Sequence, residues 1–125
     1  MDRQIRVLVA NRPKLMREVI IETFGDQPDI MIVGEVSEEA QILNSVEETH
    51  PDILFIALDE KMERPPVCDT ILRSHPEISI FAVAEHANQT MRYWASFDIH
   101  VSVMEASGEA ILSAIRSRAA VRGDA

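Results

Sequence analysis

The stretch Ile53-Leu54-Phe55-Ile56-Ala57-Leu58-Asp59 decides the fold of this chain. Its first six residues form a nearly unbroken apolar run, which is typical of a strand covered on both faces. Similar runs lie before and after it and alternate with segments of helical periodicity. Together they predict five strands, at Ile5–Ala10, Ile30–Val36, Ile53–Leu58, Ile78–Val83 and Ile99–Val103.

The segments between these runs predict five helices. The first begins near Pro13, ends at Gly25 and carries apolar residues at helical spacing, namely Leu15, Met16, Val19, Ile20 and Phe24. The fourth is a short helix from Asn88 through Trp94, and the last one begins after Ser107 as its N-cap. Strands that alternate with helices indicate a doubly wound, flavodoxin-like (βα)5 domain with a parallel sheet in the order 2-1-3-4-5.

Length and composition indicate one domain. The chain has 125 residues and 46% hydrophobic residues, and we expect a domain at 1–121 followed by a frayed tail at 122–125. The single cysteine, Cys68, excludes an internal disulfide. With no signal peptide and no long apolar run, the sequence predicts a soluble cytoplasmic protein.

The net charge also limits the partners. It is −9, from 21 acidic and 12 basic residues, and a field of this sign repels nucleic acid and anionic membranes. Three arginines lie near the end of the last helix, where they compensate the helix dipole: Arg116, Arg118 and Arg122. We therefore expect neither nucleic acid nor membrane as a partner of this domain.

In order along the chain, several segments resemble the receiver (CheY-like) domains of bacterial two-component response regulators. The segments are Ile5–Ala10 with Pro13–Glu18, Asp29–Ser37, Pro51–Ile56 and Ala110–Arg116. This resemblance implies an acidic pair after the first strand that holds a magnesium ion, and a phosphoacceptor aspartate that ends the third strand. It also implies a serine or threonine after the fourth strand and a lysine after the fifth, which offset charge during phosphoryl transfer.

This sequence departs from the receiver pattern at every one of those places. Ala10 and Asn11 stand at the acidic pair, in a turn that is one residue short. Ala57 stands at the phosphoacceptor position, Ala84 at the hydroxyl position and Met104 at the lysine position. Because alanine has no oxygen to phosphorylate, the sequence predicts a degenerate pseudo-receiver with no catalytic residue, no metal and no cofactor.

Two residues near this vacated pocket leave alternatives open. Asp59 lies two residues beyond Ala57, where it is either a substitute phosphoacceptor or a solvated loop residue. Arg12 either places a permanent cation beside Asn11, where the metal of a receiver would sit, or points to solvent. The histidines are scattered without ligand spacing, and Cys68 has no histidine near it in sequence.

Three functions from different classes follow. The first is a phosphorylation-independent interaction module that binds a signalling protein or forms a homodimer. Receivers commonly associate through their fourth helix, fifth strand and fifth helix, which would place Arg92, Tyr93, Trp94 and Arg116 in the interface. The second is a phosphorelay receiver that uses Asp59. The third is a small anionic ligand site at the carboxyl ends of the strands, attracted by Arg12 and Lys14, although no glycine-rich phosphate cradle is present there.

Overall fold

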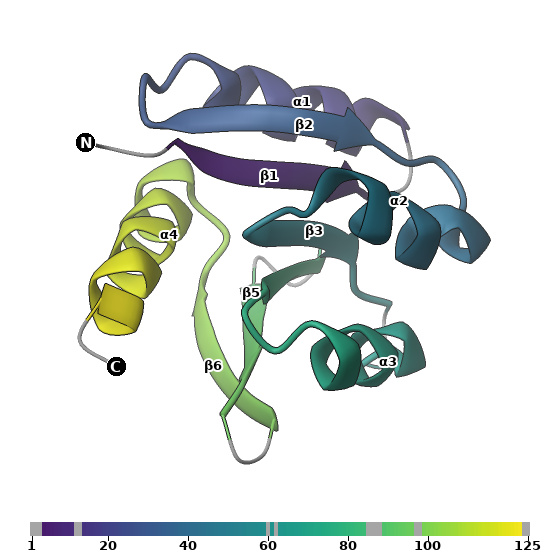
Figure 1. Cartoon of the computed structure of the whole chain (residues 1–125). Helices are drawn as coiled ribbons and strands as arrows, with labels where there is room; N and C mark the ends of the chain where they lie inside the picture. Colours follow the sequence, from purple (N-terminus) through teal and green to yellow (C-terminus); the bar gives the residue numbers. More distant parts are fainter. Residues whose placement is uncertain are drawn as a thin grey trace.

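The computed structural model describes residues 4–11, 14–59, 61, 63–84, 89–96 and 99–123, and only the backbone of residues 118–123. A six-stranded sheet in the order β2-β1-β3-β4-β5-β6 is covered by helices on both faces (Figure 1). The strands are β1 (Ile5–Ala10), β2 (Ile30–Glu35), β3 (Ile53–Ala57), β4 (Ser79–Ala84), β5 (Gln89–Ala95) and β6 (Ile99–Glu105). The helices are α1 (Lys14–Gly25), the 3-10 turn η1 (Glu39–Gln41), α2 (Ile42–Thr49), α3 (Pro66–Ser74) and α4 (Gly108–Gly123).

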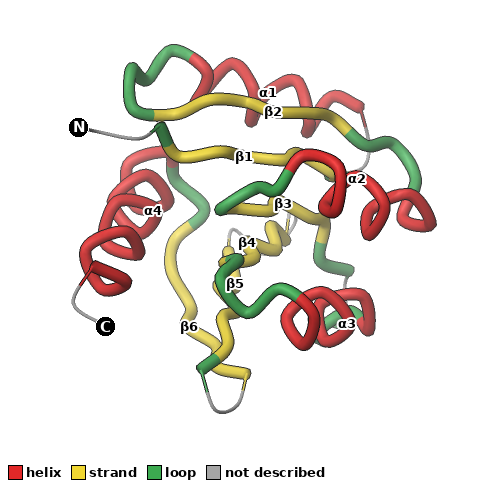
Figure 2. Tube along the Cα trace, viewed as in Figure 1, coloured by secondary structure: helices red, strands yellow, loops and turns green. Residues whose placement is uncertain are grey.

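The first four strands are parallel and lie in the predicted order, with β1 between β2 and β3 and with β4 beyond β3. The last two strands differ from the prediction. β5 pairs antiparallel with β4, and β6 pairs antiparallel with β5. Figure 2 shows β5 and β6 coloured as strands. The sheet is therefore mixed and has six strands rather than the five parallel strands that the sequence indicated.

The difference arises in the segment that was expected to form the fourth helix. Residues 89–95 form strand β5, so the prediction of a helix over 89–94 is wrong. Thr90, Tyr93 and Trp94 are types that favour strands, and alternate residues of the segment point to opposite sides of the sheet. A strand here can also pair with both β4 and β6, which a helix could not do.

Two hydrophobic layers hold the helices against the sheet. On one face, α2 and α3 pack Ile42, Val46, Ile71 and Leu72 against Leu8, Leu54, Ile56, Ile80 and Tyr93. On the other face, α1 and α4 pack Ile20, Phe24, Ile111 and Ile115 against Val7, Val9, Ile53, Phe55 and Phe81. The strands contribute alternate residues to the two layers, as expected for a sheet that is covered on both sides.

Helix α1 buries a different face from the one that its apolar residues predicted. Leu15 and Val19 are 68% and 48% exposed, whereas Arg17 is buried together with Ile20 and Phe24. These three buried positions are spaced i, i+3 and i+7, which places them on one side of the helix. The helix therefore directs an arginine toward the sheet at its first turn.

The two edges of the sheet have different geometry. The pairing of β1 with β2 shifts between Val7 and Leu8, because Val7 lies opposite Ile32 and Leu8 opposite Gly34. In contrast, β5 and β6 pair without a shift over seven consecutive residue pairs, from Gln89–Glu105 to Ala95–Ile99. A register shift like that between β1 and β2 bends an edge strand, whereas a strand paired without a shift, like β6, keeps its outer edge regular.

In the part of the chain that the structure describes, the helices are too short or too polar to span a bilayer.

Candidate functional site

The carboxyl ends of β1, β3 and β4 meet at one edge of the sheet, where an open sheet of this kind places its functional residues. Asn11 follows β1 directly, Ala57 ends β3 and Ala84 ends β4. Met104, which the resemblance placed at the lysine position, belongs to β6 and pairs with Thr90. Strand β5 therefore lies between Met104 and β4. It separates Met104 from the ends of β1, β3 and β4, with which the resemblance to receivers had grouped it.

Asn11 joins β1 to β3 from inside the protein. Its side chain is fully buried, and its Nδ2 donates a 2.7 Å hydrogen bond to the carbonyl oxygen of Ile56. Its Oδ1 atom is also buried and has no hydrogen-bond partner among the described residues. A carboxylate could not replace this amide without facing the Ile56 carbonyl with a negative charge, so the contact requires a donor.

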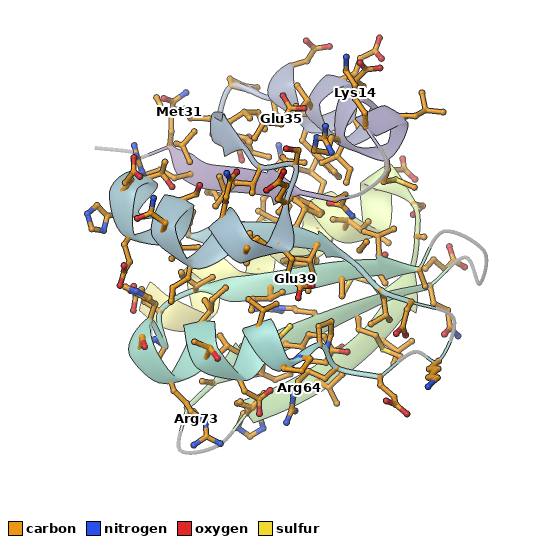
Figure 3. All side chains as sticks on the ribbon, turned by 90° about the vertical axis from the view of Figure 1, so that its right-hand side faces the viewer. Lys14, Met31, Glu35, Glu39, Arg64 and Arg73 are labelled. Atoms are coloured by element: carbon orange, nitrogen blue, oxygen red, sulfur yellow. The ribbon has the colours of Figure 1, made fainter. Side chains whose placement is uncertain are left out.

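Arg17 brings a cation to the same place. Its guanidinium NH1 group donates a 3.0 Å hydrogen bond to the backbone carbonyl of Asn11. Its Nε lies 2.9 Å from Oε1 of Glu35, the last residue of β2. Glu35 is labelled in Figure 3, on the side of the molecule where α1 and β2 lie together. The network thus connects the ends of β1, β2 and β3 to the first turn of α1.

Sequence reasoning missed Arg17 and looked for the cation at Arg12, which lies outside the described residues. A signal for Arg17 was present, because its spacing from Ile20 and Phe24 places it on the buried side of α1. Lys14, the other candidate cation, is exposed and lies 3.8 Å from Glu18. It therefore forms a surface pair rather than part of the network.

These residues do not fit a magnesium ion of the receiver type. Such an ion needs carboxylate oxygens and water at the end of β1. Here the position holds a buried amide that donates to Ile56 and a carbonyl that accepts from the Arg17 cation. Among the described residues, no group of three or more His, Cys, Asp and Glu side chains is placed to hold a metal ion.

Asp59 lies outside this buried network. It is exposed, and its Oδ1 accepts a 3.1 Å hydrogen bond from the backbone N–H of Lys61, so its side chain shapes the loop after β3. Asp59 also lines a groove of about 520 Å³ together with Glu39, Ala57 and Arg64. Figure 3 labels Glu39 and Arg64. Arg64 is already paired with Asp69, at 2.7 Å between Nε and Oδ1.

Cys68 and the histidines were the other residues considered as a nucleophile or as metal ligands. Cys68 is fully buried on α3, and burial raises the pKa of its thiol to about 12. His50 and His100 are exposed, whereas His75 is partly buried, with Glu47 and Glu77 near its ring. His86 lies outside the described residues.

Of the four residues expected at an interface, the structure brings Arg92 and Trp94 together but places Tyr93 and Arg116 elsewhere. Tyr93 is buried against the α3 side of the sheet, and burial raises its pKa. Arg92 lies on the opposite side, with its guanidinium carbon 5.2 Å from the ring centre of Trp94 and 6.0 Å from that of Phe81. Trp94 also stacks on His100 at 5.3 Å. Arg116 on α4 binds Asp29 at 2.8 Å, so it joins α4 to the loop before β2.

Comparison with solved structures identifies the fold. The chain matches the isolated REC domain of RcsB from Salmonella enterica serovar Typhimurium, whose structure was determined in the presence of the phosphomimetic BeF3−. The TM-score is 0.56 with 17% identity, over 65% of this chain and 62% of that one. The fold is that of a receiver domain. Relative to the arrangement that the resemblance implied, this receiver fold has strand β5 where a helix was expected.

Two curated proteins match parts of this receiver fold in sequence, and no family model matches it. Protein-glutamate methylesterase/protein-glutamine glutaminase 1 of Methanospirillum hungatei JF-1 is 40% identical over 60 residues, which is 48% of this chain and 17% of that protein. The protein-glutamate methylesterase/protein-glutamine glutaminase of Hydrogenovibrio crunogenus is 27% identical over 74 residues, 58% of this chain and 20% of that protein. The chain thus spans a fifth or less of the length of these curated relatives.

Proposed function

We propose that this chain is a pseudo-receiver, a receiver-fold domain of two-component-type signal transduction that binds its partner without being phosphorylated. One observation carries the proposal. Ala57 stands at the end of β3, and the adjoining end of β1 is occupied by the Asn11–Arg17 contact rather than by carboxylates. A phosphoryl group needs an oxygen to accept it and a divalent cation to offset its charge. Among the described residues, the positions at the ends of β1, β3 and β4 hold Asn11, Ala57 and Ala84, which supply neither an acceptor carboxylate nor acidic ligands for a cation.

The network of Asn11, Arg17 and Glu35 supports a single fixed state. In a switching domain the reactive end of the sheet must exist in two arrangements of similar free energy. Here a buried guanidinium is satisfied by both a backbone carbonyl and a carboxylate, and losing either contact would leave one of its N–H donors without this partner. The domain would then present one constant surface to its partner, with binding set by concentration and affinity.

The enzymatic activity that names the two curated relatives is not part of this proposal. The chain matches only a fifth or less of their length, and the described residues at the strand ends provide a buried amide and alanines rather than a nucleophile with a base. A phosphorelay role through Asp59 is the main competitor, because that carboxylate is exposed at the groove beside Ala57.

Phosphodonor chemistry separates these two functions. The protein is incubated with magnesium and either acetyl phosphate or beryllofluoride, while intact mass and the fluorescence of Trp94 are followed. We expect neither a phosphoryl mass gain nor a fluorescence change, whereas a conventional receiver treated in parallel should give both.

Two variants sharpen the result. A mass gain that Asp59→Ala abolishes would establish phosphorylation at Asp59 and refute the proposal. Ala57→Asp restores a carboxylate at the end of β3 alone, and we expect this variant to stay unphosphorylated because no acidic pair is present to hold the metal.

A further inference from the structure

Strand β6 ends the sheet with an apolar surface that no described helix covers. Val101 and Val103 are 54% and 56% exposed, although strand alternation places them on the same side as Tyr93 and Met91, which lie opposite them on β5. That side is the one covered farther along the sheet by α2 and α3. Helix α3 contacts β5 but ends its coverage there, and the β5–β6 hairpin extends beyond it (Figure 1).

The edge of β6 is also suited to pairing with another strand. It lies at the end of the strand order, and its seven residues pair with β5 without a bulge. The sequence Ile99-His100-Val101-Ser102-Val103-Met104-Glu105 contains no proline and no lysine, the residues with which proteins commonly protect an exposed edge. The opposite edge differs, because the pairing of β2 with β1 is interrupted by a shift in register.

We propose that β6 joins two copies of this chain through antiparallel pairing about a two-fold axis at Ser102. This inference rests on the proposed function and names the partner surface of that interaction module. The occupant follows from the local sequence at the centre of β6, where Ser102 has a valine on each side, whereas farther out His100 would lie opposite the partner copy's Met104 and Ile99 opposite its Glu105. With the axis there, each Val101 lies opposite the partner copy's Val103, and Ser102 lies opposite its own counterpart.

The charges on β6 permit this pairing although the whole chain carries −9. The acidic residue of β6 is Glu105, three positions from the axis. At about 3.4 Å per residue the two copies of Glu105 would be roughly 20 Å apart, which is well beyond the Debye length of about 8 Å at physiological salt. Like charges therefore do not meet across the seam, and the four valines form its centre.

Disulfide trapping tests the register directly. A cysteine at position 102 would face its own copy across the axis, where the Cα separation of an antiparallel pair suits a disulfide. We expect Ser102→Cys to form a cross-linked dimer under mild oxidation. Val103→Cys alone should not, but a mixture of Val101→Cys and Val103→Cys proteins should. The native Cys68 is fully buried and does not compete.

Sedimentation of the unmodified chain over micromolar to submillimolar concentrations tests the association itself. We expect a concentration-dependent dimer that the double variant Val101→Lys/Val103→Lys weakens at least tenfold. Val19→Lys provides a matched control, because Val19 is similarly exposed but lies on α1, and it should leave the dimer unchanged. Circular dichroism would establish that all variants are folded.

The outcomes distinguish this inference from the function on which it rests. A chain that stays monomeric, or a Ser102→Cys variant that cross-links no better than Ser37→Cys on the exposed loop after β2, would overturn the β6 dimer and leave the pseudo-receiver proposal standing. A phosphoryl mass gain would overturn the pseudo-receiver proposal whatever the oligomeric state. A dimer that dissociates in the lysine variant and ignores acetyl phosphate supports both.

Discussion

The Nε atom of Arg17 lies 2.9 Å from Oε1 of Glu35, and this ion pair joins the first turn of α1 to the end of β2. The arginine side chain is 10% exposed and the glutamate side chain 44%, so one partner is inside and the other reaches solvent. Because Arg17 also donates to the Asn11 carbonyl, it satisfies a buried acceptor that no water reaches easily. We therefore expect Arg17 to contribute more to stability than a residue in a surface ion pair does.

Replacing Arg17 tests this contribution. Arg17→Met keeps much of the packing of the side chain but leaves the Asn11 carbonyl without its donor, and we expect a loss of about 1–3 kcal/mol in the free energy of unfolding. Lys14→Met removes the exposed pair with Glu18 and should cost less than about 0.5 kcal/mol. Urea unfolding measures both, and equal effects would contradict a special role for Arg17.

The contact between Arg116 and Asp29 predicts a pH dependence. Hydrogen bonds from Arg116 hold the pKa of Asp29 below its ordinary value of 3.8. The folded state therefore gains stability from this carboxylate at pH values above the unfolded pKa, and the gain is lost as the pH falls through the lower folded pKa. Arg116→Gln should be less stable than the unchanged chain at neutral pH, with the difference vanishing well below pH 3.8.

Urea midpoints of the two proteins across this range give the measurement. Because both partners are largely exposed, the effect is small and salt should reduce it. A difference that stays constant down to the lowest pH would mean that Arg116 acts through packing rather than through the charge of Asp29.

Cys68 should resist alkylation in the folded protein. With a pKa of about 12, its thiolate fraction at pH 8 is about one in 10⁴, since the two values differ by four units (12 − 8). Burial closes the path to the sulfur as well. We expect labelling by iodoacetamide at least about 100-fold slower than in urea, while Ser37→Cys, at an exposed position, labels rapidly in the folded chain. Fast labelling at Cys68 would indicate that α3 opens readily.

Two glycines should respond to alanine in opposite directions, and neither has a left-handed backbone. At Gly25 an added Cβ would lie 3.9 Å from the nearest atom, on Ile32, so alanine should stabilise the end of α1 by about 0.4–1 kcal/mol. At Gly34 it would lie 3.0 Å from Cδ1 of Leu8, which is fully buried and cannot move freely. Gly34→Ala should cost about 1–3 kcal/mol. Thermal unfolding of the two variants provides the comparison.

The parallel half of the fold could be predicted from the sequence because its strands are buried on both faces and read as plain apolar runs. The β5–β6 hairpin could not be predicted by the same rule, since it is covered on fewer sides and mixes polar with apolar residues. The segment from Gln89 to Ala95 alternates along the sheet, but the spacing of Met91 and Trp94 also suits a helix. Asn88 as a candidate cap and this spacing favoured the helix, whereas the short link to Ile99 is the better indicator of a hairpin.

The sequence alone names residues of the candidate site, but it does not display their contacts. From alanines at positions 57 and 84 the sequence predicts that a reactive group is missing, and this stays a prediction. That Asn11 would turn its amide toward Ile56 depends on the register of β1 with β3, which a sequence does not display. Arg17 was hidden for a different reason, because a charged residue on a short helix is usually assigned to solvent.

The register shift in β2 bears on how far such assemblies can grow. If both borders of the sheet accepted a neighbour, copies could add end to end and give open fibres. Because the β2 edge has a register shift and the β6 edge is regular, each molecule has one edge strand suited to pairing with another copy. If β6 pairs as proposed, assembly would therefore stop at two molecules, because the register shift beside Val33 makes the β2 edge a poor partner for a third.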